Sequence, residues 1–209
     1  MTKFFSIQRP NLLHITMDST VNYGGNQIWY PTRFQRDAGC GPTTASHLIW
    51  YLSQTRTKCQ DLCPYNGNKP EGFLQLMEDI WNFITPKSMG VNNTDTFTNG
   101  AHRYGSHKGI ELICQTLIIP KIPGTRPTSK EMFGFLENAF SNDLPVAFLN
   151  LSNGSLTELE SWHWVTLIST DSVNNTAKKY DQGIATDINL KQWLRTSLLG
   201  GGFVTIDKK

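Results

Sequence analysis

QRDAGCGPTTASHLIWYL, residues 35–52, begins as a predicted loop and continues as a predicted helix, with the change at Cys40. Gly39 and Gly41 allow a sharp turn of the chain, and Pro42 has the fixed φ that suits a first helical turn. Apolar residues then recur with the spacing of one buried helix face: Ala45, Leu48, Ile49 and Leu52. The pattern therefore places Cys40 at or just before a helix N-terminus.

A cysteine at this position has two interpretations. The unpaired N–H groups and the dipole of a helix start favour the thiolate, which is the nucleophilic form. Most free cysteines are instead small buried hydrophobic residues. The Gly-Cys-Gly-Pro junction alone leaves both interpretations open, so the choice depends on the rest of the chain.

The composition is that of a globular protein with one substantial core. The chain has 209 residues and a net charge of +2, without a run of Lys or Arg that would indicate nucleic-acid or membrane-surface binding. No apolar run approaches membrane-spanning length. Residues 1–10 lack the apolar core of a signal peptide. We therefore expect a cytoplasmic protein if the chain is complete, and a secreted or cell-surface protein if a leader has been removed.

The cysteines do not form the pattern of a disulfide scaffold. There are four, at positions 40, 59, 63 and 114, which is too few and too irregular. Cys59 and Cys63 form a C-x3-C pair that could close a disulfide or share a metal. No second Cys/His pair at zinc-finger spacing follows, so we expect neither a metal site nor a cofactor.

Periodicity and turn residues predict an α+β fold in one domain, residues 1–209. Helices are expected in the first two-thirds of the chain and a mostly antiparallel sheet in the last third, with the helices packed on one side of the sheet. The predicted helices are 40–54, 73–84, 108–115, 128–140, and one that is capped by Asp187 or Asn189 and ends before the glycines at 200–202. The predicted strands are 27–30, 144–151, 162–168, 178–181 and 203–206, and residues 87–106 are expected to form a long loop.

A cysteine nucleophile needs a base, usually a histidine that a third polar group orients. His47 lies about two helical turns from Cys40, roughly 10 Å along the axis, which excludes direct pairing. The other histidines outside the sheet region are expected to be exposed loop residues: His14, His102 and His107.

His163 is the predicted base. It lies in a β-rich run between Trp162 and Trp164, a rigid setting of low dielectric constant. It follows Cys40 by 123 residues, a separation close to that expected for the catalytic pair of papain-like enzymes.

Asp181 is the predicted partner of His163, because it ends the next strand and adjacent antiparallel strands bring such residues within reach. Asp171 lies too near the intervening turn, and Asp187 is better explained as a helix cap. The tetrahedral oxyanion also needs donors. We expect one to be the Cys40 backbone N–H and the other to be Gln35, with Gln27 in reserve.

Short motifs in the right order resemble those of the C39-like peptidases, members of the papain-like superfamily of cysteine peptidases that include domains trimming bacteriocin leaders at double-glycine sites. The motifs are Gln35 with Cys40-Gly41-Pro42-Thr43, Asp143-Leu144-Pro145-Val146, Trp162-His163-Trp164-Val165, Tyr180-Asp181 and Gly201-Gly202-Phe203-Val204. The resemblance covers roughly residues 27–206. It implies a papain-like fold, in which a helical part faces a sheet part and the cysteine lies on a helix at their cleft.

The resemblance also implies roles for individual residues: Cys40 as nucleophile, His163 as base, Asp181 as its partner and Gln35 in the oxyanion hole. The family often has Pro after its Asp, where this chain has Gln182, and its glutamine usually stands six residues before the cysteine, not five. The chain lacks the transmembrane and nucleotide-binding parts of bacteriocin exporters.

Three functions fit this constellation. The first is a cysteine peptidase or amidase that cleaves a peptide or protein substrate through a thioester. The second is a papain-like acyltransferase or transpeptidase with the same Cys-His pair. The third is a peptide-binding module without turnover, which the presence of all four expected side chains argues against.

Overall fold

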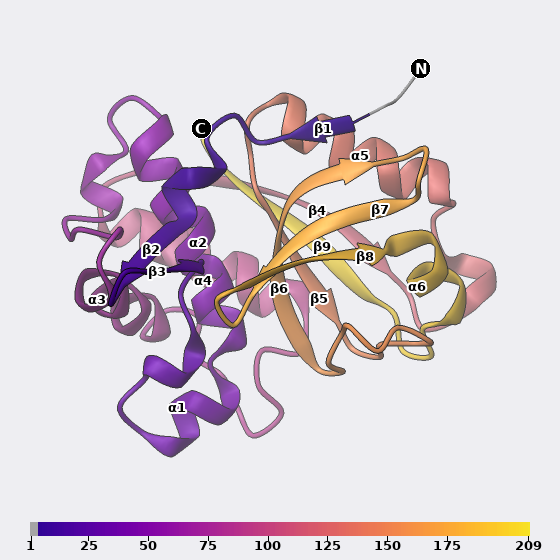
Figure 1. Ribbon diagram of the computed structural model, residues 1–209, viewed down its shortest axis with the longest axis horizontal. Coiled ribbons are helices and arrows are strands. Elements are labelled where there is room, and N and C mark those ends of the chain that lie inside the picture. Colours follow the sequence, from indigo (N-terminus) through magenta and orange to yellow (C-terminus); the bar gives the residue numbers. More distant parts are fainter. Residues whose placement is uncertain (1–3) are drawn as a thin grey trace.

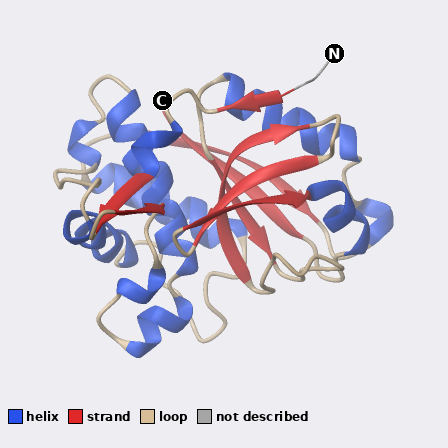
Figure 2. Cartoon of the chain, viewed as in Figure 1, coloured by secondary structure: helices blue, strands red, loops and turns tan. Residues whose placement is uncertain are grey.

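The computed structural model describes residues 4–209; residues 1–3, part of the N-terminal segment considered above, lie outside the described residues. Helices and antiparallel strands are mixed in this part of the chain, as predicted for an α+β protein (Figures 1 and 2). The main sheet has seven strands, in the order β4-β9-β5-β6-β7-β8 with β1 paired to β6, and β2 and β3 form a separate hairpin.

The strands are β1 (Phe4–Ser6), β2 (His14–Met17), β3 (Thr20–Tyr23), β4 (Leu112–Ile119), β5 (Val146–Asn150), β6 (His163–Asp171), β7 (Thr176–Asp181), β8 (Ile184–Asn189) and β9 (Gly201–Lys208). The α-helices are α1 (Arg33–Ala38), α2 (Cys40–Thr55), α3 (Pro70–Trp81), α4 (Thr94–His107), α5 (Ser129–Ser141) and α6 (Leu190–Thr196). Four short 3-10 helices connect them: η1 (Pro10–Leu13), η2 (Gln27–Trp29), η3 (Gln60–Leu62) and η4 (Pro123–Thr125).

Helix α2 is the central helix of the fold. Every residue from Cys40 to Ser53 is buried, because α2 lies between the sheet strands β6 and β9 and the helices α3 and α4. A helix that is covered on all sides can carry apolar or small residues all round, which explains why its sequence is apolar well beyond one face. The N-terminus of α2 is thereby fixed relative to the sheet.

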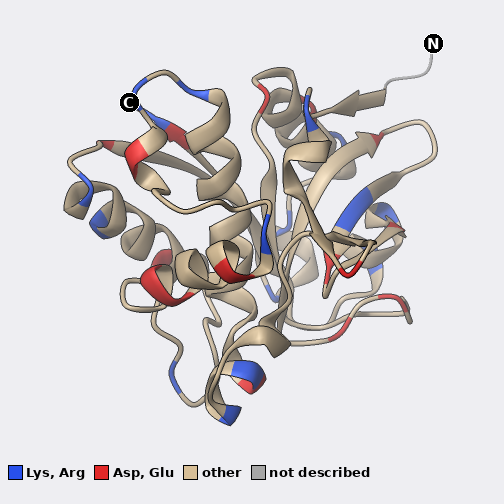
Figure 3. Ribbon diagram, turned by 60° about the vertical axis from the view of Figure 1, so that its left-hand side comes forward, with Lys and Arg blue, Asp and Glu red and all other residues tan. Residues whose placement is uncertain are grey.

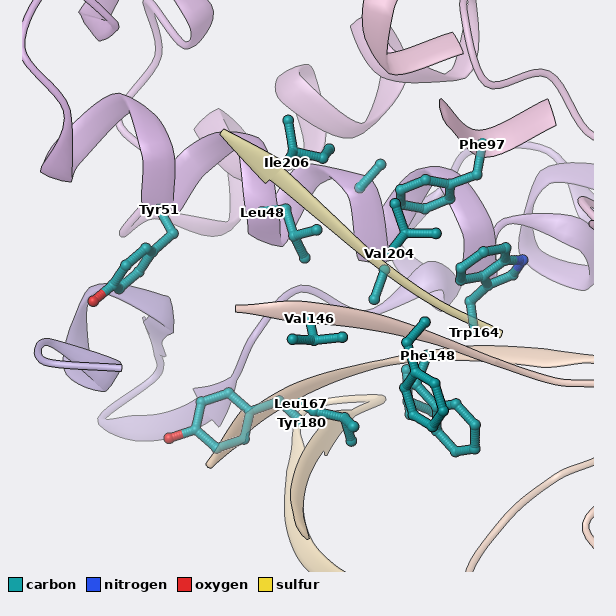
Figure 4. Close-up of a cluster of buried hydrophobic side chains, with 14 of the residues drawn as sticks. Leu48, Tyr51, Phe97, Val146, Phe148, Trp164, Leu167, Tyr180, Val204 and Ile206 are labelled. Atoms are coloured by element: carbon teal, nitrogen blue, oxygen red, sulfur yellow. The ribbon is translucent and has the colours of Figure 1, made fainter. Parts of the chain in front are cut away.

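Helices cover both faces of the sheet, so the expectation that they pack on one side is wrong. On one face, Trp164 of β6 stacks on Phe97 of α4, with ring centroids 4.5 Å apart. On the other face, Phe148 of β5 stacks on Phe203 of β9 and meets Trp193 of α6 edge-on. Figure 4 shows Phe97 and Trp164 side by side, with Phe148 on the far side of the strands. The reason is that every residue of β5 is buried, which requires cover on both sides.

Two segments differ from their predicted structure. Residues 94–107, expected to be loop, form α4, because Asn93 caps the helix and Phe97, Ala101 and Tyr104 give it a buried face that outweighs the low helix propensity of its Thr, Asn and Gly. Residues 112–119, expected to be partly helix, form β4, because all eight pair with β9.

Smaller corrections concern the segments around the predicted sheet. Residues 27–29 form η2 and not a strand, and β8 is a strand that the sequence did not indicate. The capping box predicted at Thr128 is confirmed, since its hydroxyl accepts from the Glu131 N–H and the Glu131 carboxylate accepts from the Thr128 N–H. The helix cap near position 187 is Asn189, whereas Asp187 lies in β8.

Charge is spread over the molecule without a dominant sign. Figure 3 shows basic and acidic residues interspersed over helices, strands and loops. Within residues 4–209, no helix has both the length and the apolar character needed to cross a membrane. The same residues contain no cluster of three or more His, Cys, Asp or Glu arranged to hold a metal ion.

Candidate active site

Cys40 is the first residue of α2. Gly39 precedes it without any side-chain cap, so the first N–H groups of the helix have no partner within it. The Cys40 residue is 8 % exposed and is among the lining residues of two cavities. The predicted placement of this cysteine at a helix N-terminus is confirmed.

His163 and Asp181 meet at the ends of two paired strands. His163 is the first residue of β6 and Asp181 the last of β7, and these strands are antiparallel neighbours. The His163 Nε2 lies 2.8 Å from Asp181 Oδ1. The predicted contact is therefore present, and because Nε2 is occupied, Nδ1 is the nitrogen left to face Cys40.

The surroundings of His163 favour its charged form. Burial by itself lowers the pKa of this imidazole, but hydrogen bonding to Asp181 and Cys40 and the negative charge at both raise the pKa to about 10. For Asp181, burial favours the neutral acid, yet the hydrogen bond and charge of His163, together with Lys179, hold the pKa of the carboxyl below its ordinary value. The electrostatics therefore favour an imidazolium beside an ionised carboxylate.

Lys179 is a site residue that the sequence reasoning missed. Its Nζ lies 2.8 Å from Asp181 Oδ2, and both side chains are buried, with exposed fractions of 8 % and 12 %. Residues two apart in a strand point to the same side of the sheet, so a Lys two positions before Asp181 was a usable signal. Lys179 and His163 together occupy both carboxylate oxygens.

A tight turn follows Asp181. Asp181 pairs with Ile184 across a two-residue loop, and both loop residues have positive φ, 50° at Gln182 and 81° at Gly183. This is the pattern of a type I′ hairpin. Proline, whose φ is fixed near −65°, cannot occupy position 182 in this turn, which gives a backbone reason for a non-proline residue after Asp181.

The expectation that Gln35 supplies an oxyanion donor is wrong. Gln35 is the third residue of α1, and its Oε1 accepts from the Thr32 hydroxyl at 2.8 Å and from the Thr32 N–H at 3.3 Å. Its backbone N–H in turn donates to Thr32 Oγ1, completing a capping box. The side chain is thus used to begin α1, because residues 33–38 form a short helix of their own that the sequence did not indicate.

Gln27, the reserve candidate, is the glutamine that shares a cavity with Cys40. It lines a cavity of about 10 Å³ together with Cys40 and His163. Its Nε2 donates one hydrogen to the Arg36 carbonyl at 2.7 Å, and an amide nitrogen carries a second. The cavity has about the volume of one water molecule, which is also the size of a single oxyanion.

His47 anchors the chain that carries Gln27. Its Nε2 accepts from the Gly25 N–H at 2.7 Å, so its proton lies on Nδ1, which donates to Thr166 Oγ1 at 2.7 Å. Burial lowers the pKa of His47 to about 4, against the opposing effects of the Asp181 charge and the Gly25 hydrogen bond, which keeps it neutral at pH 7. Asn26 completes the anchor, since its Nδ2 donates to the Gln182 carbonyl at 2.9 Å.

The remaining candidates are accounted for by other contacts. Asp171 accepts from the Val173 and Asn174 N–H groups in its own turn, and Asp187 pairs with Lys178 on the surface. The other histidines lie in secondary structure and not in loops: His14 in β2, bonded to the Tyr180 hydroxyl, and His102 and His107 in α4. Cys59 and Cys63 are free thiols, so the disulfide left open by the sequence is not formed.

Cys40 also lines a second, wider pocket. It has a volume of about 350 Å³, and its lining residues come from three separate segments of the chain: Phe34, Asp37 and Ala38, then Ser88, Met89 and Gly90, and finally Trp162. Cys40, the His163–Asp181 pair and a small polar cavity therefore lie beside a pocket of ligand-binding size.

No protein-family model matches the sequence, and no curated protein matches it at a significant level. Any assignment of function therefore depends on the side chains and distances described above.

Proposed function

We propose that the protein is a cysteine peptidase that hydrolyses a peptide or amide bond through a thioester, with Cys40 as nucleophile, His163 as acid and base, and Asp181 as the group that orients it. The observation that carries the proposal is the Cys40–His163–Asp181 arrangement at the N-terminus of α2, with 2.8 Å between His163 and Asp181. A helix-start cysteine beside an oriented histidine is the arrangement that activates a thiol for attack.

In the first half of the reaction, the Cys40 Sγ attacks the carbonyl carbon and the C=O π electrons move to the oxygen. The oxyanion would occupy the small cavity, with the Cys40 N–H and Gln27 Nε2 as donors. When the tetrahedral species collapses, the C–N bond breaks and the His163 imidazolium gives its proton to the departing amine. The products of this half are a free amine and a thioester on Cys40.

In the second half, a water molecule replaces the amine. Neutral His163 takes a proton from this water molecule as the water oxygen attacks the thioester carbon. The C–S bond then breaks, the acid product leaves, and the thiolate–imidazolium pair is restored. Asp181 keeps the imidazole oriented through both halves, since its hydrogen bond to Nε2 leaves Nδ1 directed to the reaction.

Two features support the more specific proposal of a papain-like fold similar to the C39-like peptidases. One is the placement of the cysteine helix α2 against an antiparallel sheet that carries the histidine on β6. The other is that a glutamine donor is present, although at position 27 and not at 35. Gln27 lies farther before Cys40 than the six residues usual in that family, so the spacing remains a departure from its pattern, and Gln182 replaces the usual proline for the conformational reason given above.

The test is turnover of a mixture of internally quenched fluorescent peptides, with products identified by mass spectrometry. Cys40→Ala should reduce turnover to background, and His163→Ala should lower it by at least about 1,000-fold. Asp181→Ala should lower kcat by less than His163→Ala, with little change in KM, because the base remains but is poorly held.

Asp171→Ala is the matched control for Asp181→Ala. It removes a carboxylate that is bonded only within its own turn, so kcat should be unchanged. Turnover that persists in Cys40→Ala would reject the proposed function. Transfer of the acyl group to an added amine in preference to water would identify an acyltransferase instead.

A further inference from the structure

Three large apolar side chains are exposed around the pocket beside Cys40. Phe34, Met89 and Trp162 have exposed fractions of 52 %, 56 % and 46 %, and they come from three separate parts of the chain. Isolated exposed apolar residues are ordinary, but several that converge on one concave surface indicate a binding site. The arrangement places this apolar lining within one pocket that also contains the nucleophile.

Met89 is held in place by a turn that is tied to the active site. The turn is closed by two hydrogen bonds between Lys87 and Gly90, and Gly90 has φ of 66°. The next residue, Val91, accepts a hydrogen bond from the Trp164 indole at 2.5 Å. Val91 also packs over Gly41, where an added Cβ would lie 2.9 Å from the Val91 side chain. The pocket wall at residues 87–91 is therefore fixed relative to Cys40.

The other two walls are also anchored. Phe34 belongs to α1 and contacts Trp81 edge-on, with ring centroids 5.9 Å apart, and the Gln27 amide holds the Arg36 carbonyl of the same helix. Trp162 directly precedes His163, with a backbone φ of 60° that few non-glycine residues adopt. The pocket is thus largely preformed, and its walls belong to the segments that position the catalytic residues.

We infer that this pocket binds a large apolar side chain of the substrate, aromatic or leucine-like, at one of the two residues on the acyl side of the scissile bond. This inference rests on the proposed function, since it takes Cys40 as the nucleophile. Aromatic rings can contact Phe34 and Trp162 edge-on or offset, and the flexible thioether of Met89 adapts to either shape.

The inference separates this chain from a peptidase that cleaves after two glycines. A Gly-Gly substrate has no side chain to place in the pocket, so about 350 Å³ of space would stay filled with water. Burying one large apolar side chain there should raise kcat/KM by about 10- to 100-fold over glycine. The substrate class is therefore expected to be peptides with a bulky apolar residue next to the cleaved bond.

Peptide aldehydes test this without knowledge of the natural substrate. The Cys40 thiol adds across the aldehyde carbonyl: an S–C bond forms, the C=O π bond breaks, and the proton ends on the oxygen as a hemithioacetal. Acetyl-Gly-glycinal, acetyl-Phe-glycinal and acetyl-Gly-phenylalaninal would be compared by their protection of Cys40 against iodoacetamide, followed by mass spectrometry. At least one phenylalanine compound should bind about 10- to 100-fold more tightly than acetyl-Gly-glycinal.

Met89→Asp should reduce that preference by about 10-fold or more, because a carboxylate penalises an apolar ligand. Met17→Asp, at an exposed methionine of β2 outside the pocket, is the control and should leave the preference unchanged. Equal binding of the three aldehydes, or a preference that survives Met89→Asp, would overturn the inference. Selective labelling of Cys40 in the same experiment would still support the proposed function. Failure of iodoacetamide to label Cys40 selectively would instead remove the proposed function, and the inference with it.

Discussion

Asp181 is held at both oxygens: Lys179 Nζ lies 2.8 Å from Oδ2, and His163 Nε2 lies 2.8 Å from Oδ1. The Asp181 carboxylate therefore bridges the Lys179 side chain and the His163 imidazole. Under the proposed function Lys179 would be a positioning residue, because its ion pair is with Asp181 and not with Cys40. Together with the hydrogen bond and charge of His163, it lowers the pKa of the Asp181 carboxyl against the opposing effect of burial.

Lys179→Met should therefore lower both stability and kcat. Removing Lys179 leaves the Asp181 carboxylate with His163 as its remaining ion-pair partner, which costs up to about 3–5 kcal/mol in the free energy of unfolding, measured by urea denaturation. The kcat should fall with KM little changed, and Lys179→Arg should restore part of it. Lys178→Met is the control, since its pair with Asp187 is exposed and worth less than about 1 kcal/mol. Equal effects at 178 and 179 would show that the buried bridge has no special role.

Gln27 and Gln35 form a natural pair of test positions. Loss of one oxyanion donor costs about 100- to 1,000-fold in kcat, so we expect a loss of that size for Gln27→Ala. Gln35→Ala should leave kcat unchanged and lower stability by about 0.5–2 kcal/mol, because it breaks the capping box of α1. Steady-state kinetics and urea unfolding on the two variants separate these effects. The reverse outcome would return the oxyanion role to Gln35.

The four cysteines should differ strongly in reactivity. Burial raises the pKa of Cys63 to about 11 and of Cys114 to about 12, and it also raises the pKa of Cys59. These three are therefore protonated and slow to alkylate at neutral pH. Cys40, beside the His163 imidazolium, should be labelled first by iodoacetamide at pH 6–7, as read from tryptic peptides, and labelling should slow in His163→Ala. First labelling of Cys114, which is partly exposed, would contradict the ion pair.

His47 should make the protein less stable in mild acid. Its pKa is about 4 in the folded protein and 6.5 in the unfolded chain, so only the unfolded chain takes up its proton between these values. Stability is therefore lost as pH falls from about 6.5 to 4, by about 3 kcal/mol at 1.36 kcal/mol per pH unit. His47→Gln should remove this part of the pH dependence in urea unfolding at pH 7 and pH 4.5. His102→Gln, on the surface of α4, should retain it; an unchanged slope in His47→Gln would refute the assignment.

The sequence by itself determined the parts of the site that depend on local pattern. A glycine-flanked cysteine followed by helical periodicity predicts a helix start, and His163 and Asp181 follow from the patterns of two consecutive strands that are paired in the sheet. The capping box at Thr128 is likewise encoded within four residues. Such features can be predicted because the interactions that stabilise them join residues close in sequence.

Tertiary structure decided the rest. Residues 94–107 and 112–119 took the structures that their buried contacts and strand partners favour, against their own propensities. The choice between Gln27 and Gln35 depended on α1, whose capping box uses Gln35, and on His47 and Asn26, which anchor the segment that carries Gln27. Lys179 and the apolar pocket are likewise products of distant segments meeting. A contact between residues far apart in the chain leaves no local periodicity, so only the folded packing reveals it.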